Sequence, residues 1–222
     1  MLFTDPDRAR IAEAIATAES RTAGEIVVIV TSERQRYPAT ALSVAALLAL
    51  ALPLVMLLAG WSPAGLFADW GDAAAVDNVR HALETVVLLQ ALVFVAVLAA
   101  VYFTGLGHTL TPRGLRRDRV HRAAMTQFKA RGLEQTSGRT GVLIYIDEPE
   151  HLAEVIADTA IYAKVAPDHW VATITALIDG MKAGRPADGV VAAVGLAADV
   201  LAAHFPYQAN DVNELADHLI EL

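Results

Sequence analysis

Residues 41–60, ALSVAALLALALPLVMLLAG, and residues 85–107, TVVLLQALVFVAVLAAVYFTGLG, decide the organisation of this chain. The first run has no ionisable side chain, and Gln90 is the one strongly polar interruption of the second. At ~1.5 Å per residue, each run is long enough to cross the ~30 Å hydrocarbon core of a bilayer as a helix. Buried helices of soluble domains are usually shorter and keep a polar stripe. The two runs therefore predict two transmembrane helices, the first bent at Pro53.

The Lys and Arg residues beside these runs predict the orientation, because such residues favour the cytoplasmic side. Two arginines precede the first run, and a row of five follows the second. Residues 61–84, between the runs, contain one arginine and four acidic residues. We therefore expect a multi-pass protein of the bacterial inner membrane with both termini in the cytoplasm and a short external loop. The flanking arginines are Arg34 and Arg36 before the first run, and Arg113, Arg116, Arg117, Arg119 and Arg122 after the second.

The segments outside the hairpin are expected to fold together. Two spans return the chain to the side from which it came, so residues 1–40 and 108–222 can form one cytoplasmic domain that residues 41–107 interrupt. The first forty residues mix charges of both signs and lack the apolar run of a secretory signal, which favours a retained anchor over a cleaved leader.

Local patterns predict the elements of this domain. A helix is expected from Thr4 or Asp5 to Glu19, and dense β-branched runs at 25–31 and 141–147 predict two strands of one sheet, covered on both faces. A helix from Thr111 to about 131 should turn Leu115, Val120, Ala124 and Phe128 inward. Further expectations are a strand at 153–157, helices at 168–180 and 190–203, a surface turn at 182–189 and a terminal helix from about 210 to 220. Helices alternating with a few buried strands indicate an α/β domain, a small sheet sandwiched between helices.

Composition excludes several kinds of chemistry. The net charge of −8 gives no support to nucleic-acid binding, which usually shows a basic face. The chain has no cysteine, and so no disulfide, thiolate metal ligand or cysteine nucleophile. The sequence also lacks a phosphate-binding GxxxxGK[ST] loop.

Three short motifs in order give the chain a family likeness. They are AExxTxGEI at residues 18–26, TxxRTGVLIYI at 136–146, and HFP with a following NEL at 204–215. Together they resemble the TPM domain, in particular its bacterial membrane-protein members with a transmembrane hairpin inserted in the domain. The resemblance implies an α/β sandwich. In some family members it also implies acid-phosphatase activity, calcium binding, or a role in assembling or repairing membrane complexes. One departure is EHLAEVIAD at 150–158, where an ERR-like stretch normally enters the third strand.

Two functions remain open on the sequence. The first is a non-enzymatic membrane protein whose cytoplasmic domain binds a membrane or cytoplasmic protein partner, or maintains a membrane complex; self-association through small residues of the first span is also possible. The alternative is an acid-phosphatase-like hydrolase that depends on a divalent cation such as calcium. Its metal ligands would be Asp147, Glu148 and Asp158, with Glu150 nearby. Glu19 and Glu25 flank a turn, and their simplest role is to hold the helix-to-strand connection.

Overall fold

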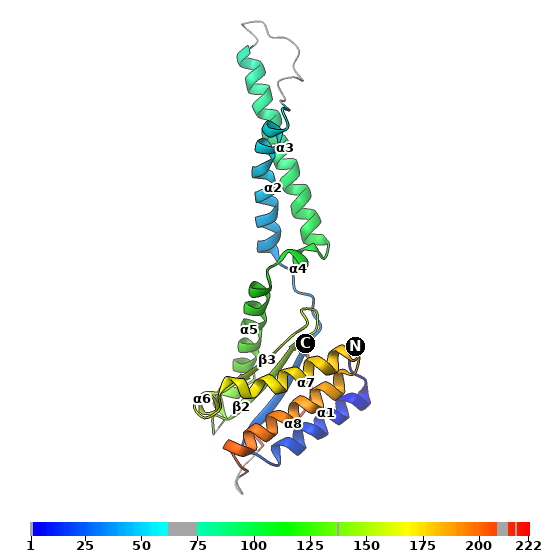
Figure 1. The fold of residues 1–222 in the computed structure, drawn as a ribbon, viewed down its shortest axis with the longest axis vertical. Coiled ribbons are helices and arrows are strands. Elements are labelled where there is room, and N and C mark those ends of the chain that lie inside the picture. Colours follow the sequence, from blue (N-terminus) through cyan, green and yellow to red (C-terminus); the bar gives the residue numbers. More distant parts are fainter. Residues whose placement is uncertain (1, 62–74, 137, 208–212, 216) are drawn as a thin grey trace. The chain divides into compact units, whose positions relative to one another are not determined.

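The computed structural model describes residues 2–61, 75–136, 138–207, 213–215 and 217–222 (Figure 1). The chain divides into two compact units. One comprises residues 1–34 and 114–222, and the other residues 35–113. The first unit contains a mixed α/β domain, and the second contains two long apolar helices.

A four-stranded sheet forms the centre of the α/β domain. Its strands are β1 (Glu25–Thr31), β2 (Gly141–Asp147), β3 (Leu152–Ala157) and β4 (Ile220–Glu221), in the order β3-β2-β1-β4. β1 is parallel to β2 and to β4, whereas β2 and β3 are antiparallel. Every residue of β1 and β2 is buried. The predictions that these two runs belong to one sheet and that a third strand follows are confirmed.

Four longer helices accompany the sheet: α1 (Asp5–Glu19), α5 (Arg113–Ala130), α7 (Trp170–Lys182) and α8 (Pro186–His204). The short helix α6 (Thr159–Tyr162) and two 3-10 turns, Leu133–Gln135 and Pro167–His169, lie between them. α1 starts as predicted, because the Thr4 side chain accepts a hydrogen bond from the Asp7 N–H and the Asp7 carboxylate accepts one from the Thr4 N–H. α7, α8 and α1 lie side by side in Figure 1.

Alternate residues of the central strands belong to two hydrophobic clusters, since successive side chains of a strand point to opposite faces. In β1, Ile26, Val28 and Val30 pack with buried residues of α1, α7 and α8. Val27 and Ile29 pack instead with Val120, Ala124 and Phe128 of α5. The continuous β-branched run is thus explained by burial on both faces.

Three local expectations were wrong. Leu115 is 57% exposed, because it lies on the side of α5 opposite the buried residues Val120, Ala124 and Phe128. The expected terminal helix is absent from the described residues of that segment, where Ile220 and Glu221 instead pair with β1. The expected turn at 182–189 is shorter, since α8 already begins at Pro186.

The second unit is built on α2 (Pro38–Leu58), α3 (Ala75–Phe103) and the short α4 (Leu106–Leu110). The buried side chains of α2 are Ala41, Ala45 and Ala49, four residues apart on one face of the helix, and α3 packs beside α2. Near one end, Arg36 donates a hydrogen bond to the Tyr102 hydroxyl at 3.3 Å. Most of the predicted external loop lies outside the described residues.

Among the described residues, three helices are long and apolar enough to cross a membrane: α2, residues 79–103 of α3, and α8. They differ in burial, because 44% of the apolar window of α8 is buried, against 22% for α2 and 6% for α3. α8 has eight buried residues, and seven of them belong to the hydrophobic core of the α/β domain.

Candidate functional site

A polar cavity of about 530 Å³ opens where β1 and β2 begin. Parallel strands start at the same edge of a sheet, so Glu25 and Gly141 are paired neighbours there. The C-terminal end of α8 and the segment after α6 complete the wall. The lining residues are Ala23, Glu25, Thr136, Gly138, Thr140, Lys164, His204, Phe205, Pro206 and Glu214.

The three sequence motifs of the family likeness meet at this cavity. Thr22 donates a side-chain hydrogen bond to the Phe205 carbonyl at 2.6 Å, and the Ala23 N–H donates to the same carbonyl at 3.0 Å. Thr140 donates from its hydroxyl to the Ala23 carbonyl at 2.7 Å. Thr22 of the first motif and Thr140 of the second therefore join segments that are more than a hundred residues apart in the sequence.

Position 141 requires glycine because the backbone at Leu133 passes very close to it. A Cβ atom at this position would lie 2.6 Å from the backbone oxygen of Leu133, a distance that real Cβ contacts essentially never show. Gly24 is less restricted, since its nearest neighbour would be the flexible end of the Leu201 side chain at 3.0 Å. The glycine of the second motif thus has a steric role that local turn chemistry does not explain.

Charges of both signs line the cavity. The Glu25 side chain is buried and accepts a hydrogen bond from the Glu214 N–H at 3.1 Å. The Lys164 ammonium lies 4.4 Å from the centre of the Phe205 ring, within the range of a cation–π contact. The ring of His204 stands 6.4 Å from that of His169, nearly perpendicular to it. Such a site suits a polar group that both donates and accepts hydrogen bonds.

Glu19 holds the connection between α1 and β1, as its position suggested. One carboxylate oxygen accepts a hydrogen bond from the Ile26 N–H at 2.9 Å, and the other accepts one from the Asn213 side chain at 3.4 Å. Burial raises the pKa of Glu19 to about 9, and the nearby carboxylates of Asp217 and Glu25 act in the same direction. Glu19 is therefore protonated at neutral pH, and the terminal segment is tied to α1 through an uncharged carboxyl.

The predicted metal ligands are not brought together. Asp147 ends β2 beside Leu152, the first residue of β3, whereas the Asp158 N–H donates to the Gly141 carbonyl at the other end of that strand pair. A seven-residue strand separates these ends by ~20 Å, so one cation cannot bind both carboxylates. The Asp158 side chain caps α6. Glu148 accepts a hydrogen bond from Ser32 at 2.8 Å.

Within the part of the chain that the structure describes, no three His, Asp or Glu side chains are grouped so that they could hold a metal ion. Lys164 and Glu214, which line the cavity, were not singled out from the sequence. The only sequence signal for Glu214 was its place in the NEL motif, and Lys164 had none.

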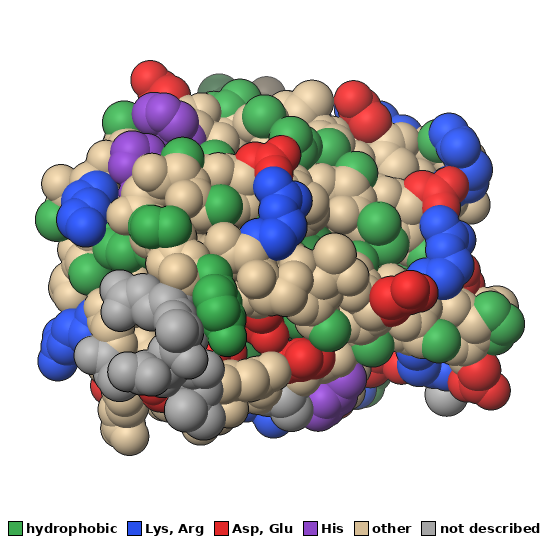
Figure 2. Space-filling model, turned by 90° about the horizontal axis from the view of Figure 1, so that it is seen from below, with side chains coloured by type: hydrophobic (Ala, Val, Ile, Leu, Met, Phe, Trp, Pro, Cys, Tyr) green, Lys and Arg blue, Asp and Glu red, His purple; other side chains and the backbone are tan. Residues whose placement is uncertain are grey.

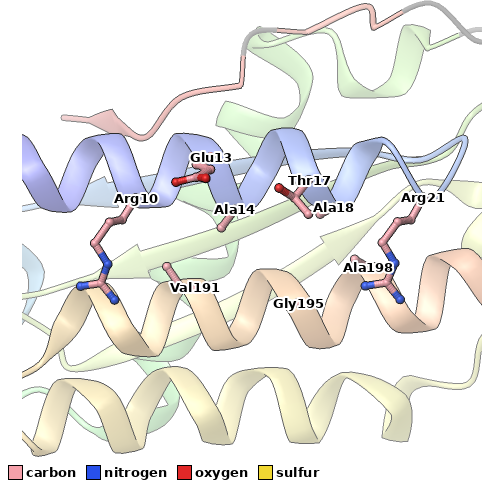
Figure 3. A pocket seen from close by; sticks show the side chains of 9 residues that line it. All are labelled: Arg10, Glu13, Ala14, Thr17, Ala18, Arg21, Val191, Gly195 and Ala198. Carbon is pink, nitrogen blue, oxygen red and sulfur yellow. The ribbon is translucent and has the colours of Figure 1, made fainter.

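A second hollow, of about 390 Å³, lies between α1 and α8 (Figure 3). Its floor is made of small residues, among them Ala14, Ala18, Gly195 and Ala198. Arg10 and Arg21 stand at its two ends in Figure 3, and each forms an ion pair of 2.7 Å, with Asp188 and Asp199 respectively. Both pairs join residues 178 positions apart, so α1 and α8 run parallel in register. We interpret this hollow as the groove of a tight helix pair.

The face of the protein shown in Figure 2 has basic side chains beside acidic ones, with hydrophobic side chains scattered between them. A mixed α/β domain joined to helices that are long and apolar enough to cross a bilayer is consistent with a membrane protein.

Comparisons with known proteins add evidence on the fold. No family model matches the chain, and no curated protein matches it. The chain is similar to a solved structure, the NMR structure of BA42 protein from the psychrophilic bacterium Bizionia argentinensis. The two are 19% identical with a TM-score of 0.58, over 99% of this chain and 95% of that chain. At this identity the likeness concerns the fold alone.

Proposed function

We propose that this chain is an inner-membrane protein whose cytoplasmic, TPM-like α/β sandwich binds a protein partner and thereby helps to assemble or maintain a membrane complex. The observation that carries the proposal is the convergence of all three motif segments on one polar cavity. The cavity offers Glu25, Lys164 and His204, and the described residues contain no group of three His, Asp or Glu side chains that could hold a metal ion. Such a lining favours recognition of a polar segment over catalysis.

Two membrane spans, rather than three, fit the burial of the apolar helices. Asp188 and Asp199 of α8 are ion-paired with Arg10 of α1 and with Arg21 just after it, and buried apolar residues of α8 belong to the domain core. Crossing a bilayer would expose this helix to lipid and break the core. α2 and α3 have the opposite character, since most of their large side chains are exposed, including Leu50, Leu57 and Leu88 at 70% or more. Exposed leucines of this kind are stabilised by hydrocarbon.

Single cysteines can test on which side of the membrane the α/β domain lies, because the natural chain has no cysteine that would be labelled in the background. We expect Glu13→Cys and Lys182→Cys in intact cells to resist a membrane-impermeant thiol reagent until the membrane is opened. Asp77→Cys, just before the second span, should react at once. Labelling of Glu13→Cys and Lys182→Cys from opposite sides would refute a single domain on one side of the membrane.

Partner binding is tested by photo-crosslinking of the full-length protein in its own membrane. A crosslinking amino acid at Gly138 or Lys164 should yield one discrete heavier product, and one at Lys182, exposed on a different surface, should not. The product from Gly138 should be lost when Glu25→Gln changes the charge of the cavity. Equal products from all three positions, or none from the cavity, would contradict partner binding at this site.

The hydrolase alternative is weakened by the separation of Asp147 and Asp158. We expect the intact protein to hydrolyse p-nitrophenyl phosphate no faster than a buffer blank, with calcium or magnesium present. Hydrolysis that required the metal and vanished in Asp147→Asn would establish the alternative instead.

A further inference from the structure

The first turns of α5 form an exposed basic end of the helix. Arg113 and Arg117 are both exposed and, four residues apart, lie on the same side of the helix. Neither has a hydrogen bond or ion pair with any residue that the structure describes. Arg116 behaves differently, because its guanidinium lies 3.4 Å from the buried carboxylate of Glu150 and so serves the α/β domain. Arg116 therefore serves the α/β domain, whereas Arg113 and Arg117 are without such a contact among the described residues.

This basic end follows the hairpin unit directly in the sequence. Arg113 is the last residue of the compact unit that contains α2 and α3, ten residues after Phe103, and Arg117 is four residues farther along α5. Apolar exposure continues along that connection, since Phe103 is 82% exposed and Leu106 and Leu110 of α4 are each 47% exposed. Exposed apolar residues followed directly by free arginines are typical of segments that lie at the boundary between acyl chains and headgroups.

The charge of the surface selects the class of lipid. A guanidinium binds phosphate oxygens through two parallel hydrogen bonds, and the cytoplasmic leaflet carries a negative surface potential. We propose that Arg113 and Arg117 bind the phosphate groups of anionic phospholipids at the surface of the bilayer that α2 and α3 cross. This inference rests on the proposed membrane insertion of the hairpin.

The test uses a fluorophore on Gly114→Cys, between the two arginines, in the full-length protein reconstituted into phosphatidylcholine vesicles. A Cβ at Gly114 meets no atom within 4 Å, so the label position is tolerated. Quenching by brominated phosphatidylglycerol is compared with quenching by brominated phosphatidylcholine. We expect the anionic lipid to be preferred, and Arg113→Gln with Arg117→Gln to reduce that preference by ~5-fold for each arginine and ~30-fold for the pair.

The matched control removes the same charge at the other end of α5 and from the residue just after it. Lys129 and Arg131 are exposed, and Lys129→Gln with Arg131→Gln should leave the lipid preference unchanged. The effect of the arginine pair should also decrease at high salt, because exposed charges are screened. Equal quenching by both lipids in the labelled protein that keeps Arg113 and Arg117 would overturn the inference. So would a control pair that loses as much of the lipid preference as the arginine pair does.

A second label separates this inference from the proposal on which it depends. Leu47, in the middle of α2, is 68% exposed, so a fluorophore on Leu47→Cys reports insertion of the hairpin. Quenching at position 47 without anionic preference at position 114 refutes lipid binding by α5 and leaves membrane insertion standing. Absence of quenching at position 47 refutes membrane insertion itself.

Discussion

Gln90 replaces a hydrogen bond that Pro53 removes from α2. In an α-helix the carbonyl of residue 49 accepts from the N–H of residue 53, and proline has no N–H. The Gln90 side chain of α3 donates to this Ala49 carbonyl at 3.1 Å. In hydrocarbon no water is present to satisfy a free carbonyl. The one strongly polar residue of the second apolar run and the one proline of the first are therefore coupled.

The expected magnitude follows from this geometry. Hydrogen bonds between transmembrane helices contribute ~0.6 kcal/mol on average and up to ~1.7 kcal/mol. Since the Ala49 carbonyl has no donor within its own helix, we expect Gln90→Met to destabilise the hairpin by about 1.5 kcal/mol. With Pro53→Ala, position 53 regains its N–H, and the same change should then cost about 0.5 kcal/mol. The predicted coupling energy between Gln90 and Pro53 is thus ~1 kcal/mol.

A double-mutant cycle on the full-length protein in mixed micelles measures this coupling. Spin labels on Leu48→Cys and Leu92→Cys, both on exposed positions, report the fraction of packed hairpin as the proportion of dodecyl sulfate rises. Val95→Met, on an exposed position of α3, is the control for a change to methionine that removes no hydrogen bond. If Gln90→Met has the same cost with proline and with alanine at position 53, the reasoning is refuted.

Two further predictions concern the α/β domain, each measured by urea unfolding of the intact protein in detergent. The pKa of Glu19 is raised in the folded protein to about 9, so its stabilising contribution is complete below its ordinary pKa of 4.5 and is lost as the pH rises towards 9. Glu19→Gln should therefore unfold with a weaker pH dependence than the natural chain between pH 5 and 9, and parallel curves would contradict the protonated state. Gly141→Ala should lower the free energy of unfolding by about 2 kcal/mol, since its Cβ would overlap the Leu133 backbone oxygen. Gly195→Ala, whose Cβ meets open space inside α8, should instead be neutral or stabilising by up to ~1 kcal/mol, and an equal loss in both would disprove the steric argument.

Elements with strong local patterns were predicted well. α1 has its capping residues and its apolar spacing within fifteen residues, and β1 and β2 are short runs whose burial on both faces requires apolar residues at every position. The apolar runs of α2 and α3 were likewise predictable, because their length and lack of charge are read directly from the chain, although α3 begins ten residues before its uncharged run. In each case the information lies within one segment.

Features that depend on strand register and on the packing of one element against another were not predicted. The antiparallel register of β2 and β3 places Asp147 and Asp158 at opposite ends, although their nearness in sequence suggested one acidic group. The edge strand β4 is two residues long and exists only because β1 offers it a free edge. Leu115 was expected inside, but it lies on the side of α5 opposite Val120, Ala124 and Phe128, the residues that pack on the sheet.

The amino-acid sequence by itself determined that two long apolar helices interrupt an α/β chain, because hydrophobic length and periodicity are local properties that need no partner. Only the tertiary structure decided that Thr22 bonds Phe205 and Thr140 bonds Ala23 beside one cavity, and that Ala49 receives its hydrogen bond from Gln90. Hydrogen bonds and steric contacts act over a few ångströms, so they form only after the fold has brought these distant residues together.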